Sequence, residues 1–510
     1  MELRPHKPAL LGQADKAGKR SMVTVMLFAL LFVGWVGEWP IEIDTVLYSG
    51  LWRSPFGVFG PLFAPIPGIS LFPWQLLLFA LVPFCLGSAR QHAREMDRAI
   101  FVSIGCIAVT LLWGLLRGGS AYFAYYQVWR FLAGLLIAYL LMSALRTERD
   151  LVTLGKIIVL AALIRATLCI YFYWAYLYGK PHAISEYVTN HDDSMLFVAG
   201  LLVVLVWAAV KGGRAAWISA GLITPYVFYA VILNNRRIAW VELALSLPVI
   251  YVLIGAGPAR SRINKWLLRA APVVLVYFVA GLGSSASVFA PVHALLTTGS
   301  NYDPSSLTRQ EEARNLLHTL VDLGNPILGN GWGVPYDKAE SYWSNYDSGW
   351  VLSLYTPHNA ILGLAAFSGL VGMIGIWGVI PVGAYLAARG YRGSTEPVPR
   401  ATAMVALGGL VAYSVHCYGD IGLQSFAGVL ILGVALGAAG KIAAWREAHP
   451  AAQTATARAA DHSSPVARGR NHPSVPAWRR YTPSWQRPGS SGGGDLPAKP
   501  KRVPRRRLSR

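Results

Sequence analysis

The sequence predicts an all-α polytopic membrane protein with about twelve transmembrane helices, one large outer loop domain that contains an amphipathic helix, and a disordered basic C-terminal tail. Of the 510 residues, 54% are hydrophobic and only 14% are charged. The mean hydropathy of +0.42 is unusual for a soluble chain of this length. Several apolar runs of about 17–22 residues are long enough to cross a bilayer. These observations, together with basic connections on alternate sides, predict the fold class.

Twelve apolar segments are the candidate membrane spans. Their predicted bounds are Met22–Glu38, Leu71–Leu86, Ala99–Leu116, Gln127–Leu145, Ile157–Gly179, Ser194–Val210, Ala216–Leu233, Ile238–Ile254, Pro272–Leu282, His358–Ala388, Ala401–His416 and Gln424–Ala439. The ninth is short and is expected to reach back into Leu267–Ala271. The first has no small-residue cleavage site close behind it, so we interpret it as a retained span rather than a removed signal peptide.

The connections between these segments alternate in charge. Lys and Arg gather in the N-terminal arm and in every second connection after it. All of these basic connections fall on one side when twelve spans are threaded in order. By the positive-inside rule that side is the cytoplasm, so both termini are expected to be cytoplasmic.

The segments divide the chain into five regions. These are a cytoplasmic arm (1–21), transmembrane helices 1–9 (22–282), an outer loop (283–357), transmembrane helices 10–12 (358–440) and a basic cytoplasmic tail (441–510). From about Ala451 the tail is rich in Pro, Ser, Gly and Arg and has too few apolar residues to fold. We expect it to be disordered and held near anionic lipid headgroups, with RNA or protein binding as the alternative. Much of the net charge of +20 lies there, so this charge does not by itself predict a nucleic-acid partner.

The outer loop is long enough to form a small domain. Thr308-Arg309-Gln310-Glu311 has the form of a helix capping box. Apolar residues then recur on one helical face, at Ala313, Leu316, Leu317 and Leu320. This pattern predicts an amphipathic helix at the membrane surface. Asn325-Pro326 is expected to end the helix, and Gly329–Gly333 to form a turn.

A polar cluster, Thr356-Pro357-His358-Asn359, opens the tenth apolar segment. Thr356 suits the N-cap and Pro357 suits the first helical position. His358 and Asn359 would then lie in the first turn, where unpaired N–H groups and the helix dipole favour an anion. The same environment disfavours a charged imidazole, so His358 is expected to be neutral and able to accept a proton. The alternative is a plain helix-cap residue at the membrane interface.

Arginines on the outer side break the expected charge distribution. Arg236-Arg237 interrupts an apolar hairpin where positive charge opposes the topology signal. A guanidinium presents a bidentate fork to phosphate, so this pair is a candidate phosphate clamp; the alternative is a turn whose side chains snorkel to lipid phosphates. Arg309 is predicted in the first turn of the loop helix, where a cation is unfavourable without a nearby anion. Arg314 is a weaker candidate, since exposed helix charges are usually a solvated face.

Arg165 lies in the middle of an apolar span, where a charge is costly and is a functional candidate by default. The alternative is a structural ion pair with Glu242. Three further histidines, His191, His318 and His416, are expected to be structural. The outer loops carry no cluster of His, Asp and Glu at metal-ligand spacing, and the chain has no phosphate-cradling nucleotide loop. We therefore expect no metal and no cofactor.

Three motifs in order resemble the signature of the O-antigen ligase/O-antigen polymerase superfamily. His358-Asn359, nine residues and Gly369-x-x-Gly372 resemble its histidine motif, and the two glycines would also let helices pack closely. Arg237-Ile-Ala-Trp240 is similar to its Arg-Gly-Ala-type motif, with Ile238 where the family often has Gly. Arg309 followed by Asn325-Pro-Ile-Leu-Gly-Asn-Gly331 is similar to its loop pattern. The similarity covers roughly Tyr226–Ala388.

The resemblance implies a membrane glycosyltransferase of the bacterial inner membrane whose site faces the periplasm. The donor would be a glycan on undecaprenyl pyrophosphate, and neither a metal nor a nucleotide sugar would be needed. The acceptor would be lipid A–core, as in an O-antigen ligase of lipopolysaccharide biosynthesis, or another lipid-linked glycan, as in an O-antigen or exopolysaccharide polymerase. Of the two, we predict the ligase.

The same resemblance implies roles for the candidate residues. His358 would act as general base on the acceptor hydroxyl, with inversion at the anomeric carbon. Arg237 and Arg309 would stabilise charge on the leaving diphosphate. Residues expected to bind substrate are Arg236, Asn359, Arg314 and Arg165. Two hypotheses from other classes stay open: a flippase or transporter for lipid-linked glycans, and a non-enzymatic membrane scaffold.

Overall fold

The structure is a computed structural model that describes residues 21–37, 63–66, 69–71, 73–86, 92–178, 188–255, 257–284, 289, 292, 293, 296, 304–339 and 353–448. Within these ranges the chain is an all-α polytopic membrane protein with one short antiparallel hairpin, β1 (Phe63–Ile66) and β2 (Ile69–Leu71). All of these residues belong to one compact unit that ends at Thr454. The predicted N-terminal arm and the part of the tail beyond residue 448 lie outside the described residues.

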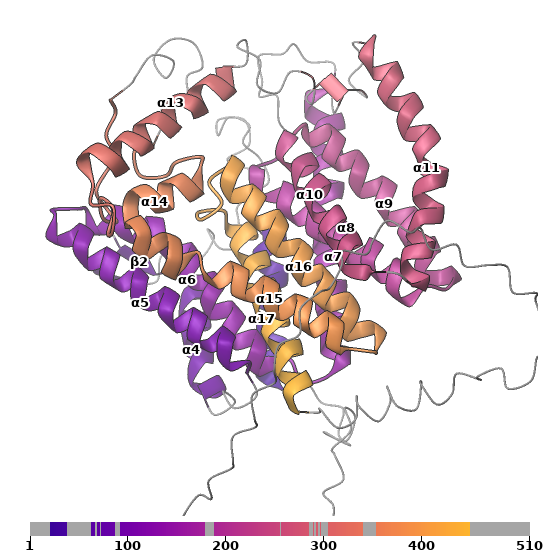
Figure 1. The fold of residues 1–510 in the computed structure, drawn as a ribbon, viewed down its shortest axis with the longest axis horizontal. Coiled ribbons are helices and arrows are strands. Elements are labelled where there is room, and N and C mark those ends of the chain that lie inside the picture. The colour runs from indigo at the N-terminus through magenta and orange to yellow at the C-terminus, as the bar shows by residue number, and fades with distance from the viewer. Residues whose placement is uncertain are drawn as a thin grey trace, which may run out of the picture. The chain divides into compact units, whose positions relative to one another are not determined.

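The helices are α1 (Met22–Gly37), α4 (Pro73–Leu86), α5 (Arg94–Leu116), α6 (Ala121–Ala144), α7 (Glu148–Phe172), α8 (His191–Lys211), α9 (Arg214–Asn234), α10 (Arg237–Ile254), α11 (Pro258–Leu282), α13 (Pro304–His318), α14 (Ala360–Val371), α15 (Val379–Gly393), α16 (Pro397–Gly419) and α17 (Phe426–Ala448). The π-helical turns η2 (Tyr173–Leu177), η4 (Thr319–Leu323) and η5 (Gly372–Ile376) follow α7, α13 and α14. Figure 1 shows their arrangement.

Ten helices of the described part are long and apolar enough to cross a membrane, and each overlaps a predicted span. The other two predicted spans correspond to α1 and α4, which are apolar but only 16 and 14 residues long. The ninth span is longer than predicted: α11 begins at Pro258, and Pro272 lies inside it rather than at its start. Pro is tolerated within membrane helices because neighbouring groups satisfy the freed carbonyl.

Helix α17 forms the centre of the bundle. Every residue from Phe426 to Ala444 is buried, and α17 packs against α6, α16, α15 and α8. A Cβ atom at Gly433 would come within 2.6 Å of the Gly134 carbonyl oxygen of α6, so the two backbones approach directly. Helix α11, in contrast, lies at the edge of the bundle in Figure 1 and is largely exposed.

Helix α17 also corrects the predicted start of the tail. It continues to Ala448, eight residues beyond the predicted boundary at residue 440. Lys441 is buried in this last part of the helix, and its ammonium lies 5.8 Å from the ring centre of Trp445. Residues 441–448 are therefore helical and not part of a disordered tail. The contact with Trp445 compensates in part for burying the Lys441 charge in this helix.

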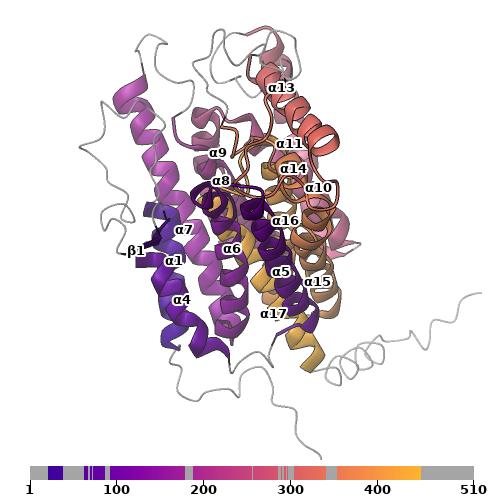
Figure 2. The same ribbon diagram turned by 90° about the vertical axis from the view of Figure 1, so that its left-hand side faces the viewer.

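Helix α13 lies beyond one end of the bundle, next to α14, in both ribbon views (Figures 1 and 2). It begins at Pro304, so the predicted capping box at Thr308 is wrong, and Arg309 lies in the second turn rather than the first. Its end agrees with the prediction, since η4 stops at Leu323, just before Asn325-Pro326.

The side of this helix that faces the protein is not the apolar one. The buried side is mostly polar and consists of Thr308, Glu311, Glu312, Asn315, Leu316 and Thr319. Leu317, one of the apolar residues predicted at the membrane surface, is 47% exposed. Polar residues at helical spacing define this face because α13 covers the polar ends of other helices rather than an apolar surface.

A break in α14 interlocks with the loop that follows α13. Gly369 has φ +55° and ψ −149°, which interrupts the helix. The N–H groups of Leu370 and Val371 donate to the carbonyls of Pro326 and Ile327 at 2.9 and 3.0 Å. The loop thus takes over hydrogen bonds that the helix loses at the break.

Glycine is required on both sides of this contact. Gly329 has φ +67°, and a Cβ there would lie 2.5 Å from the Phe367 carbonyl carbon. A Cβ on Gly369 would lie 2.6 Å from the Gly329 nitrogen. The predicted role of Gly369 in helix packing is therefore wrong: Gly369 packs against a loop, in a conformation that side chains disfavour.

Candidate functional site

Helix α8 begins with three consecutive polar residues, His191, Asp192 and Asp193, and each binds a different part of the chain. The residue before them, Asn190, caps the helix by accepting a hydrogen bond from the Asp193 N–H at 3.3 Å. The three side chains and their partners are His191 with Asp420, Asp192 with Ser425, and Asp193 with Arg165. This turn therefore joins α7, α8 and the connection between α16 and α17.

Arg165 forms a buried ion pair with Asp193. Its Nε donates to Oδ1 at 2.6 Å, and the two side chains are 1% and 3% exposed. The alternative pairing with Glu242 is wrong, because Glu242 pairs instead with His416, whose Nδ1 lies 2.8 Å from Oε1. Arg165 lies late in α7, at the same end of the bundle as the start of α8, and the antiparallel order of the helices decides its partner. This position does not support contact with a substrate.

Asp420 is the acidic centre of the cluster. It follows α16 directly and is buried, and its carboxylate pairs with the His191 ring. Burial acts to raise the pKa of Asp420 and is the largest single effect, but the lowering effects, led by the charge and hydrogen bond of His191, together outweigh it. The charges of His416 and Arg309 lower this pKa further, so that it lies well below its ordinary value. Arg309 of α13 is therefore electrostatically coupled to Asp420 at the C-terminal end of α16.

The adjacent arginines between α9 and α10 have different environments. Arg236 is buried, at 4% exposure, with Nη1 lying 3.0 Å from Nε2 of His191 and Nη2 donating to the Thr189 carbonyl at 3.3 Å. Asn234 also holds Thr189, accepting from its N–H at 2.8 Å. Arg237 is exposed at the first position of α10. One arginine thus fixes the start of α8, and the other faces outward.

His358 lies just before α14 and not in its first turn. The helix begins at Ala360, and Asn359 is the N-cap, accepting from the Leu362 N–H at 3.0 Å. The predicted cap at Thr356, with Pro357 in the first helical position, is wrong. Asn is at least as strong a cap as Thr, and here it stands three residues closer to the apolar run.

Glu312 of α13 is the anion that binds His358. Its Oε2 accepts from the His358 backbone N–H at 2.8 Å, and its Oε1 lies 3.3 Å from Nδ1 of the ring. Glu312 is buried, whereas the His358 side chain is 18% exposed. The predicted anion-binding position is therefore occupied by a carboxylate of the protein itself.

Sequence reasoning missed Glu312, although a signal was present. Glu312 belongs to the polar residues that recur at helical spacing along α13, whereas the sequence-based prediction of this helix used only its apolar residues. The charge of Glu312 acts on the buried Tyr336. Burial raises the pKa of the Tyr336 phenol, and the charges of Glu312 and Glu311 raise this pKa further. The carboxylates therefore face inward, toward the body of the protein.

Helix α13 connects the two parts of the site. Arg309, coupled to Asp420, and Glu312, bound to His358, are three residues apart, which is about one helical turn. Arg309 and Arg314 are both exposed. The structure thus places His358, Arg309 and Arg236 on α13 and near the starts of α8 and α14 and the end of α16. Arg237 lies beside Arg236, and Arg165 lies deeper.

The part of the chain that the structure describes has no group of three or more His, Cys, Asp or Glu side chains arranged to hold a metal ion. Comparison with known protein families finds none that matches this chain, and comparison with curated proteins finds no matching relative. The functional conclusion therefore depends on the geometry and on the sequence motifs.

Proposed function

We propose that this protein is a membrane glycosyltransferase of the O-antigen ligase type. It would transfer a glycan from undecaprenyl pyrophosphate to an acceptor hydroxyl, with lipid A–core as the acceptor. The observation that carries this proposal is the pairing of His358 with Glu312. A carboxylate accepts hydrogen bonds but cannot donate them, so in the neutral imidazole the proton lies on Nδ1 and the lone pair on Nε2. This is the tautomer that a general base needs.

The exposed arginines supply the positive charge for the leaving group. Arg309 lies one turn from Glu312, and Arg237 begins α10 next to the buried Arg236. Guanidiniums bind diphosphate through paired hydrogen bonds and stabilise the charge that develops as the glycosidic bond breaks. Arg314, farther along α13, strengthens the local positive field.

The reaction is a direct displacement. The acceptor oxygen attacks the anomeric carbon while its proton passes to Nε2 of His358. The bond from the anomeric carbon to the diphosphate oxygen breaks, and undecaprenyl diphosphate leaves with the electron pair. Attack opposite to the leaving group inverts the anomeric centre. In this scheme Arg236 and Asn359 position other groups. Arg236 holds the His191 ring, and Asn359 caps the helix that follows His358.

In this proposal the chemistry lies on the periplasmic side of the inner membrane. We take all twelve apolar helices, α1 and α4 included, as spans, with both termini in the cytoplasm and the loop at 283–357 outside. Threading then puts the starts of α8, α10 and α14 and the end of α16 on the outer face. The contacts of His191 with Asp420 and with Arg236 join three of these helix ends, in agreement with that threading.

The test uses a bacterial strain that lacks its own O-antigen ligase. Expression of the chain is expected to restore glycan on lipid A–core, seen as a shifted band pattern on a lipopolysaccharide gel. His358→Ala and Arg309→Ala should each abolish or strongly reduce it at equal membrane levels of protein, by about 10²–10³ in rate for the arginine.

A parallel strain that lacks its own polymerase separates the alternative acceptor. A restored ladder of repeats there, without capping in the first strain, would mark a polymerase. The transferase assignment fails if neither strain is restored while His358→Ala behaves like wild type in the native host.

A further inference from the structure

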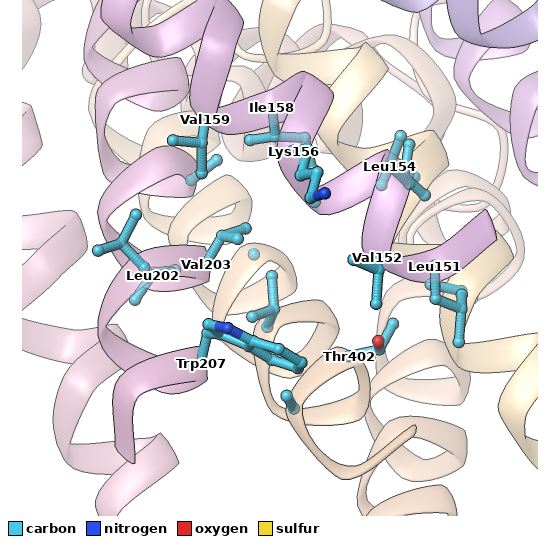
Figure 3. A pocket seen from close by; sticks show the side chains of 18 of the residues that line it. Leu151, Val152, Leu154, Lys156, Ile158, Val159, Leu202, Val203, Trp207 and Thr402 are labelled. Atoms are coloured by element: carbon cyan, nitrogen blue, oxygen red, sulfur yellow. The ribbon is translucent and has the colours of Figure 1, made fainter. Parts of the chain in front are cut away.

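A large apolar cavity lies away from the polar cluster. Its volume is about 560 Å³, within the range of roughly 300–1,000 Å³ that is typical of small-molecule sites. Side chains of α7, α8, α9, α16 and α17 line it, and most of them are aliphatic. Figure 3 shows Lys156, Trp207 and Thr402 around the same opening.

The cavity lining extends along α8 from Ala199 to Lys211, away from the polar cluster at the start of that helix. The cluster includes Asp193 of α8, whereas the cavity lining reaches Lys211, 18 residues farther along that helix. At 1.5 Å per residue this separation is about 27 Å. In the proposed topology the Lys211 end of α8 faces the cytoplasm. The cavity is therefore separate from the site at His358.

The charged residues of the cavity lining are all cations. Lys156 and Lys211 contribute to it, and no Asp or Glu is among the lining residues. Lys211 lies 4.8 Å from the ring centre of Trp207. Within the described ranges, neither lysine forms an ion pair with a carboxylate. Two cations without a carboxylate partner among the described residues, beside an apolar wall, are complementary to an anion attached to an apolar chain.

We propose that this cavity binds an anionic phospholipid of the cytoplasmic leaflet, with an acyl chain in the apolar interior and the phosphate between Lys156 and Lys211. The lining offers few polar groups, with Ser219 and Thr402 as its hydroxyls, so a soluble polar ligand would lose most of its hydrogen bonds there. The glycan donor is excluded as the occupant, because its diphosphate would bind at the other end of α8. The choice of leaflet and the exclusion of the donor rest on the proposed function, whereas lipid retention is measured without any transferase assay.

The test is native mass spectrometry of the full chain, exchanged into mixed micelles that contain phosphatidylglycerol or phosphatidylcholine with matched acyl chains. Wild type is expected to retain phosphatidylglycerol preferentially. Since each basic residue near a membrane surface contributes about fivefold to anionic lipid binding, Lys156→Gln and Lys211→Gln should each weaken the preference about fivefold, and the double variant about 25-fold. Lys265→Gln, an exposed lysine of α11 outside this cavity, is the matched control and should leave it unchanged.

A second variant addresses the apolar interior. Thr402→Phe fills part of the cavity and is expected to reduce retention of both lipids, while thermal unfolding followed by tryptophan fluorescence checks that the protein stays folded. The proposal is overturned if wild type retains both lipids equally. It is also overturned if the double lysine variant keeps the preference to within twofold, or if Lys265→Gln lowers it as much as the lysine variants do.

Discussion

Glu312 contacts His358 twice, through the backbone N–H at 2.8 Å and through Nδ1 of the ring at 3.3 Å. One carboxylate from α13 thus fixes both the main chain and the imidazole at the start of α14. A residue bound in this way has its ring orientation set before any substrate arrives, which is what a general base requires.

Replacing Glu312 by Gln is expected to lower the transfer rate by about 10²-fold while leaving the protein in the membrane at normal levels. An amide can donate as well as accept, so it no longer selects the tautomer with the proton on Nδ1. The measurement is transfer of glycan from purified undecaprenyl pyrophosphate donor, followed over a range of pH. Glu311→Gln, on the same buried face, is the control, and an equal loss in that variant would contradict a specific role for Glu312.

Gly369→Ala should destabilise the protein and reduce activity. An alanine at φ +55° costs about 1–3 kcal/mol, and its Cβ would also meet the Gly329 nitrogen at 2.6 Å. Gly221→Ala in α9 is the matched control, since a Cβ there meets no atom within 4 Å. Thermal unfolding in detergent compares the two. Equal melting temperatures would show that the interlock with the loop does not stabilise the fold.

Breaking the Arg165–Asp193 pair should be more harmful than removing it. Arg165→Met leaves the Asp193 carboxylate buried without its partner, at a cost of about 3–5 kcal/mol. The double variant Arg165→Met, Asp193→Leu removes both charges and should recover most of that stability. Denaturant unfolding of the four proteins in a double-mutant cycle measures the coupling. If the double variant is no more stable than Arg165→Met, the pair is not the reason for the loss.

Asp420 predicts an acid-dependent contribution to stability. Its pKa in the folded protein lies below the ordinary value of 3.8, so folding favours the ionised form. The contribution is therefore fully present above about pH 4 and is lost as the pH falls toward the folded pKa. The difference in melting temperature between wild type and Asp420→Asn should be smaller at pH 3 than at pH 5. A difference that grows on acidification would contradict this assignment.

The membrane architecture could be predicted from the sequence because hydropathy and basic connections act over whole segments. All twelve predicted apolar segments correspond to helices, although only ten reach a spanning length. The errors in the prediction lie at the helix ends, where a single capping residue decides where a helix begins. Asn359 is as good a cap as the predicted Thr356, and Pro304 suits the first helical position, so local preference alone does not decide between neighbouring ends.

The site was predictable in its residues and less so in their partners. His358, Arg309 and Arg236 stand out as polar residues in apolar or turn contexts. Their partners, Glu312, Asp420 and His191, are separated from them by 45 residues or more along the chain. Sequence spacing carries no information about such contacts. Arg236 and Arg237 illustrate the limit, since one is buried and the other exposed although they are neighbours with the same side chain.

The enclosed position of α17 has a consequence for biogenesis. This helix is made after every other described helix, yet α6, α15, α16 and α8 all pack around it. During synthesis the earlier helices are in the membrane before α17 is made, so the surfaces that later contact α17 are not yet covered. Assembly of the interior is therefore a late event, and nascent chains halted before Phe426 should be targets for membrane quality-control proteases.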